Sequence, residues 1–250
     1  MKKIMYILAA ISVCACMLLT ACSNSNSSGG GSGNNSGGGV NLGGSSNNGS
    51  SNNNNNNDSD DDDDDIDDDS GSEVEYFCGS MEDGVFSSSF LGIGADFSGE
   101  EWIWMTREEL SSYNGGATTD EELKRKAEAG NSVYEMLAGK ETGSNVNVVV
   151  QKMGIGSVIL EVTEEEYVDM SVDSLAETLV GVIDNAVAEK INVSFAGANH
   201  YGIDVVGQSY GMDVYERIIC ISKGNYMGLV TITSMSNEER EEFTEKFYKL

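Results

Sequence analysis

Residues 23 to 72 contain almost nothing that a folded protein could bury. The stretch consists mainly of Ser, Asn, Gly and Asp, and it includes the run NNNNNNDSDDDDDDIDDD at residues 52 to 69. Its only sizeable apolar side chains are Val40, Leu42 and Ile66. Because buried apolar surface must offset the entropy lost on ordering, such a chain cannot fold by itself. The sequence therefore predicts a disordered linker over residues 22 to 72.

The aspartate run in this linker extends the chain rather than binding calcium. A flexible chain of this kind reaches roughly 40 Å over fifty residues, and repulsion between its carboxylates lengthens it further. An EF-hand loop counted from Asp65 has Ser70 where glycine is required and Tyr76 where the final glutamate is required. We expect a tether that holds a folded domain, residues 73 to 250, away from its point of attachment.

The N-terminal residues 1 to 21 are typical of a lipoprotein signal peptide. Two lysines precede an apolar run from Ile4 to Leu19, which is shorter than a membrane-spanning helix requires. The run ends in Leu19-Thr20-Ala21-Cys22, which resembles the lipobox of bacterial lipoproteins. The resemblance implies cleavage before Cys22 and a diacylglyceryl group on its sulfur. Two acyl chains would hold the protein at the extracytoplasmic face of the cell membrane.

The charge of the domain argues against nucleic acid as a partner. From Glu73 to the C-terminus the chain has 12 basic and 32 acidic residues, and such a surface repels nucleic acid.

The two cysteines of the domain can be interpreted in two ways. A disulfide between Cys78 and Cys220 is one interpretation for an exported protein. In the alternative, Cys220 is a small buried hydrophobe on a strand. No cysteine pair in the domain has zinc-site spacing, so we expect no metal.

The domain alternates between strand and helix signals. Alternating or β-branched runs predict a hairpin and further strands at Gly84–Phe97, Trp102–Met105, Asn145–Met153, Val214–Ser222 and Tyr226–Ser234. Capping boxes predict helices after Thr106, Thr119 and Thr163, the second ending at Gly130.

The third predicted helix is long, with apolar residues three or four apart from Val168 to Ala186 and Gly181 inside it. A final helix from Ser236 places Phe243, Phe247 and Leu250 on one side. Tight turns join antiparallel strands, and amphipathic helices must cover a sheet. We therefore predict an α+β fold, an α/β/α sandwich with a central mainly antiparallel sheet.

Seven segments of the domain carry a resemblance to a known family: Phe90-Leu91-Gly92-Ile93, Trp102 with the Thr-x-x-Glu-Leu helix after it, Tyr134–Ala138, Thr142–Val148, Glu165-Glu166-Tyr167, Tyr215–Ile221 and Tyr226–Thr233. With these segments the domain resembles the PsbP-like (Mog-type) α/β/α sandwich of bacterial surface lipoproteins. The chain departs from the family at Ser98-Gly99-Glu100-Glu101, where a Pro-x-Gly turn is usual. The resemblance implies a domain that works by binding other proteins.

Four aromatic residues are the candidate binding surface. Trp102 and Trp104 would point to the same side of a strand, either into the core or into a binding groove. Tyr113 and Tyr201 are candidates to extend such a groove.

Catalytic residues and cofactors are not predicted. The single histidine, His200, lies in a predicted loop before a strand, and histidine triads and most zinc sites lack a second member. Glu-rich helix starts suit the helix dipole. A glycosidase-type carboxylate pair is defined in space, so the sequence leaves it open.

Two functions therefore compete. The first is a non-enzymatic binding or interaction module with a protein or envelope partner. The alternative is an envelope glycan or peptide hydrolase with paired carboxylates. A solute receptor for a transporter is disfavoured, because such receptors are commonly larger and two-lobed.

Overall fold

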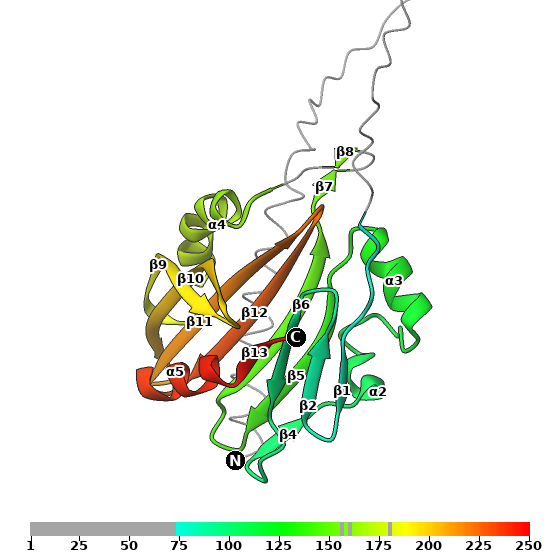
Figure 1. The fold of residues 1–250 in the computed structure, drawn as a ribbon. Helices are drawn as coiled ribbons and strands as arrows, with labels where there is room; N and C mark the ends of the chain where they lie inside the picture. The colour runs from blue at the N-terminus through cyan, green and yellow to red at the C-terminus, as the bar shows by residue number, and fades with distance from the viewer. Residues whose placement is uncertain (1–73, 156–157, 160–161, 180–181) are drawn as a thin grey trace, which may run out of the picture. The chain divides into compact units, whose positions relative to one another are not determined.

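In the computed structural model, the described residues are 74–155, 158–159, 162–179 and 182–250. They form a mixed α+β domain of mostly antiparallel sheets with few helices (Figure 1). The predicted signal peptide, Cys22, the linker at 22–72 and Gly181 lie outside the described residues. None of the helices in the described part of the chain is long and apolar enough to cross a membrane.

A seven-stranded sheet forms the centre of the domain. Its strands, in spatial order, are β4 (Trp102–Trp104), β5 (Val133–Lys140), β6 (Asn145–Lys152), β12 (Tyr226–Ser234), β11 (Met212–Lys223), β10 (Ala198–Ser209) and β9 (Asp184–Phe195). Every neighbouring pair is antiparallel. The strands predicted from alternating and β-branched runs are confirmed, including the hairpin between β11 and β12.

A second, four-stranded sheet has the order β1 (Ser80–Glu82), β2 (Val85–Ser88), β3 (Ile93–Asp96) and β13 (Phe247–Lys249). The predicted hairpin over Gly84–Phe97 is confirmed as β2 and β3. A short ribbon of β7 (Gly154–Ile155) and β8 (Val158–Ile159) extends beyond β6.

The largest apolar cluster joins the four-stranded sheet to one face of the central sheet. It combines Phe86 and Ile93 with Val148 and Val230, and Figure 1 shows β1 and β2 lying over the central strands. Leu123 of α3 (Asp120–Glu128) and Phe243 of α5 (Asn237–Glu245) enter the same cluster. This face is therefore closed by strands together with two helices.

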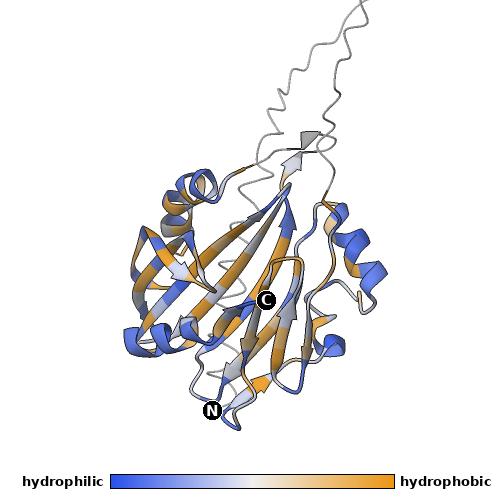
Figure 2. Ribbon diagram, in the orientation of Figure 1, coloured by the Kyte–Doolittle hydropathy of each residue, from blue (hydrophilic) through white to orange (hydrophobic). Residues whose placement is uncertain are grey.

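The opposite face packs on α4 (Glu164–Thr178). Its Val168 and Leu175 contact a second cluster that includes Ile218 and Cys220 of β11, while Ile219 belongs to the first cluster. The short helix α2 (Arg107–Leu110) inserts Leu110 against β5 in a third cluster. Figure 2 shows the apolar residues along the central strands and the hydrophilic outer faces of the helices.

The predicted helix starts are confirmed, but the predicted ends of two helices are wrong. All three capping boxes form, and Gly130 ends α3 with φ of 80°. The third helix stops at Thr178, and Ala186 lies on β9. A spacing of four residues fits one helical turn and also two strand repeats, so the apolar pattern could not distinguish them.

The C-terminal helix also ends earlier than predicted. It stops at Glu245, and the segment from Phe247 pairs with β3 as β13. Phe243 and Phe247 both reach the first apolar cluster, so the change of element keeps both rings buried.

One further prediction is corrected, and one open alternative is decided. His200 lies inside β10 rather than in a loop, because Ala196 and Gly197 make the turn with φ of 47° and 81°. Cys78 and Cys220 are not joined by a disulfide. They pack in clusters on opposite faces of the central sheet, which rules out the disulfide and supports the buried-hydrophobe interpretation of Cys220.

Candidate functional site

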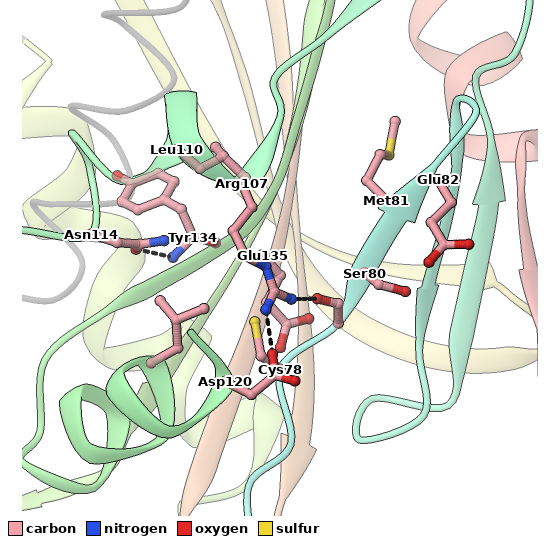
Figure 3. A pocket seen from close by; sticks show the side chains of 12 residues that line it. Cys78, Ser80, Met81, Glu82, Arg107, Leu110, Asn114, Asp120, Tyr134 and Glu135 are labelled. Carbon is pink, nitrogen blue, oxygen red and sulfur yellow. Dashed lines mark hydrogen bonds and ion pairs between the residues drawn. The ribbon is translucent and has the colours of Figure 1, made fainter. Parts of the chain in front are cut away.

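A cleft of about 330 Å³ lies beside β5, between residues 78 to 82 and the helices α2 and α3. Its polar side chains come from Cys78, Ser80, Glu82, Arg107, Asn114, Asp120, Tyr134 and Glu135 (Figure 3). The short strand β4 pairs with β5 only from Ala138 to Lys140, so the other end of β5 borders this cleft instead of another strand.

A β-bulge turns Glu135 toward the interior. Tyr134 pairs with Val149 and Met136 with Val148, so Glu135 is the extra residue of β5. Only 3% of Glu135 is exposed. The Tyr76 hydroxyl donates a hydrogen bond to Glu135 Oε1 at 2.9 Å, which ties the first described residues to β5.

Burial sets the protonation states of the Glu135 carboxyl group and of the neighbouring Cys78 thiol. Loss of water raises the pKa of Glu135 to about 7, although the Gly79 backbone N–H and the Tyr76 hydroxyl act against it. Burial, followed by the charge of Glu135, raises the pKa of the Cys78 thiol to about 12. Because the thiolate is the reactive form, Cys78 is a poor nucleophile at neutral pH.

An ion pair closes one side of the cleft. Arg107 donates to the carboxylate of Asp120 and to the Gly79 carbonyl, the latter at 3.2 Å (Figure 3). Both charged residues directly follow a capping threonine, Thr106 in one case and Thr119 in the other. The two capping boxes therefore fix the helix starts that bring the pair together.

The Asn114 side chain takes the place of a neighbouring strand beside Tyr134 of β5. Its Nδ2 donates to the Tyr134 carbonyl at 2.9 Å, and the Tyr134 N–H donates to its Oδ1 at 2.9 Å. One side chain thus satisfies a buried backbone donor and acceptor of β5 beside the bulge.

The cleft offers hydrogen-bond donors and acceptors to a polar ligand. Its cation is paired, its thiol is protonated and its deepest carboxyl group is bound to Tyr76. In the described ranges, no group of three His, Cys, Asp or Glu side chains is placed to hold a metal ion.

The four aromatic residues predicted as a binding surface lie in three different packed clusters. Trp102 is 3% exposed and its ring lies 4.5 Å from that of Phe97. Trp104 packs half-buried beside the same cluster, Tyr113 lies in the α2 cluster, and Tyr201 borders the α4 cluster. A binding role for the three half-buried residues stays a prediction.

The cleft residues were missed because their contacts are distant in sequence. The one local signal is Glu135 itself, a single acidic residue inside the apolar run Val133–Ala138. A charge at such a position needs a partner or a raised pKa.

Comparisons with known proteins add similarities of fold but no family. No family model and no curated protein matches the sequence. The chain is similar to the solution structure of PsbP (CyanoP) from Synechocystis, at 11% identity over 72% of this chain and 96% of that one, with a TM-score of 0.37. It is also similar to LpqN, described as involved in cell envelope biogenesis of Mycobacterium tuberculosis, at 7% identity over 62% and 82%, with a TM-score of 0.35. At these scores, the function must be argued from the residues of this chain.

Proposed function

We propose that this protein is an exported lipoprotein with a PsbP-like α/β/α domain that acts as a non-enzymatic binding module. The anchor is supported by the apolar run and the Leu19-Thr20-Ala21-Cys22 sequence after it. The linker at 22–72 would let the domain reach a protein or envelope partner away from the membrane surface.

The observation that carries the binding role is the state of the polar groups in the cleft. Arg107 and Asp120 neutralise each other, and the Cys78 thiol has a pKa of about 12. Such groups recognise a polar segment by hydrogen bonding and provide no activated nucleophile. The cleft is therefore suited to holding a ligand rather than to transforming it.

A second candidate is the hydrolase with paired carboxylates. Glu135 and Asp120 line the same cleft, and the raised pKa of Glu135 is the kind that a general acid needs. Its near-complete burial argues against it, because a general acid must come within hydrogen-bond reach of the scissile oxygen.

In-cell cross-linking followed by mass spectrometry distinguishes the two candidates. For the binding module, we expect one discrete partner with the wild-type protein and its loss with Cys22→Ala, together with loss of palmitate labelling. Palmitate labelling that survives Cys22→Ala would refute the proposed anchor. Release of glycan or peptide fragments by the wild type, abolished in Glu135→Gln, would refute the binding module and support the hydrolase.

A further inference from the structure

The strand β9 leaves one long edge of the central sheet open. Within the described ranges, β10 is its only partner strand. All of its residues before the buried Phe195 are exposed or half-buried, whereas every residue of β12 is buried. Figure 1 shows β9 at the margin of the sheet, beside α4. An edge of this length is a template for pairing with another chain.

The turn at Ala196 and Gly197 determines which backbone groups face outward. Phe195 and Ala198 flank this two-residue turn and pair directly. In such a hairpin the closing pair exchanges both of its hydrogen bonds, and every second pair repeats this along the ladder. The N–H and C=O groups that point away from β10 are therefore those of Ala188, Lys190, Asn192 and Ser194.

Little protects this edge from a partner. A bulge opposite Gly207 distorts only its first residues, where Asn185 has φ of 55°. Lysine side chains often guard edge strands, but Lys190 turns back to α4. Its Nζ lies 2.9 Å from Glu165 Oε1 and 2.7 Å from Asp169 Oδ1. The stretch Val187–Ser194 thus stays regular and accessible.

The surroundings of the edge are strongly acidic on one face. The helix α4 carries six acidic residues and no basic residue. Its exposed carboxylates come from Glu165, Glu166, Asp169, Asp173 and Glu177. Lys190 is the only basic residue in these two elements.

The other face of the same edge is largely apolar, apart from Glu189, which lies between Val187 and Ile191 on that side of β9. Val187 and Val206 are paired across β9 and β10, with 55% and 42% of their surfaces exposed. The half-buried Ile191 follows on the same side of β9. A strand added here would meet apolar side chains and the single carboxylate of Glu189 on this face, and the carboxylates of α4 on the other.

We propose that the Val187–Ser194 edge takes an extended, basic segment of a partner protein as an eighth strand, at a surface separate from the cleft. Alternating side chains of that segment would place lysine or arginine beside α4 and apolar residues beside Val187 and Val206. Backbone hydrogen bonds would provide the affinity, and the alternation the specificity. A second copy of this chain would bring the same negative charges to the edge, which disfavours self-pairing.

The test uses the full-length protein and a synthetic peptide of alternating lysine and valine. Asn192→Pro removes one outward N–H without touching the ladder to β10, and Asn192→Thr is the matched control that keeps it. We expect wild type and Asn192→Thr to bind with equal affinity and Asn192→Pro to bind at least about tenfold more weakly, the cost of about 1.4 kcal/mol. Equal binding by all three, or no binding by wild type, would overturn the proposal.

Hydrogen exchange in the wild-type protein tests strand addition independently of whether the proline variant folds. In the wild-type protein, the peptide should slow exchange of the outward amides of Ala188, Lys190, Asn192 and Ser194. A peptide in which glutamate replaces lysine should not do so. Binding that leaves these amides unprotected would mean adsorption to α4 by charge alone, and would equally refute strand addition. Neither result bears on the cleft, so failure here leaves the proposed function standing.

Discussion

The side-chain amide of Asn114 pairs with the backbone of Tyr134 as a neighbouring strand would, with both hydrogen bonds at 2.9 Å. Asn114→Ala removes these two hydrogen bonds from a buried N–H and a buried C=O of β5. We expect the free energy of unfolding to fall by about 3 kcal/mol, measured by urea denaturation. The control is Asn131→Ala, which removes an exposed bond to the Lys126 carbonyl. Equal losses in the two variants would contradict the structural role of Asn114.

Two buried carboxyl groups should make stability fall as pH rises. Burial raises the pKa of Glu135 and of Glu216 to about 7, from an ordinary value of 4.5. Both states are protonated below pH 4.5, so this contribution is fully present there. Between pH 4.5 and about 7 the unfolded chain ionises first, and each group costs about 1.4 kcal/mol per pH unit.

The comparison of wild type with Glu135→Gln isolates one of these groups, because glutamine does not titrate. The stability of wild type minus that of the variant should fall between pH 4.5 and 7 and then level off. Glu216→Gln should give a second profile of the same sign. A difference that rises with pH would show that the carboxyl group is stabilised in its charged form.

Glu164 holds two strands where their ladder ends. Its Oε2 accepts from the Tyr201 N–H at 3.1 Å, and its Oε1 accepts from the Ser222 N–H at 3.2 Å and lies 2.8 Å from His200 Nδ1. Glu164→Ala should lower the free energy of unfolding by about 3 kcal/mol, because two backbone donors lose their acceptor.

Its neighbour Glu165 provides the control. Glu165→Ala removes an exposed ion pair with Lys190 and should cost less than about 1 kcal/mol. Hydrogen exchange of the Tyr201 and Ser222 amides should accelerate only in Glu164→Ala. Unchanged exchange at both amides would contradict the role of Glu164 in joining the two strands.

Asp204 forms ion pairs with two nearly buried guanidinium groups. It bonds Arg217 Nε at 2.8 Å and lies 3.0 Å from Arg240 Nη1. Burial already lowers the pKa of Arg240, so Asp204→Asn should destabilise the domain by about 3 kcal/mol. Glu241→Gln, at a half-exposed partner of Arg217, should cost about 1 kcal/mol or less in chemical denaturation. Similar losses in both variants would contradict the ranking.

Local signals explain what the sequence predicted well. A capping box is complete within four residues, so the starts after Thr106, Thr119 and Thr163 could be located without the rest of the chain. The alternation of Asn145–Met153 likewise reports one strand by itself. The end of α4 and the strand β13 depend on partners far away in the chain, and no local pattern specifies them.

The cleft depends still more on distant contacts. Tyr76 and Glu135 are 59 residues apart and meet only because β5 bulges against β6. Strand register is a property of two strands together, so the sequence could mark Glu135 as unusual but could not place Tyr76 or Cys78 beside it.

The most direct test of the binding module is site-specific photo-cross-linking in living cells. One photoreactive residue replaces Ser80 at the cleft, and another replaces the exposed Asp213 on β11. The account predicts a single discrete adduct from position 80, none from position 213, and loss of the adduct with Cys22→Ala. Equal capture from both positions, or capture only from position 213, would contradict a binding role for the cleft.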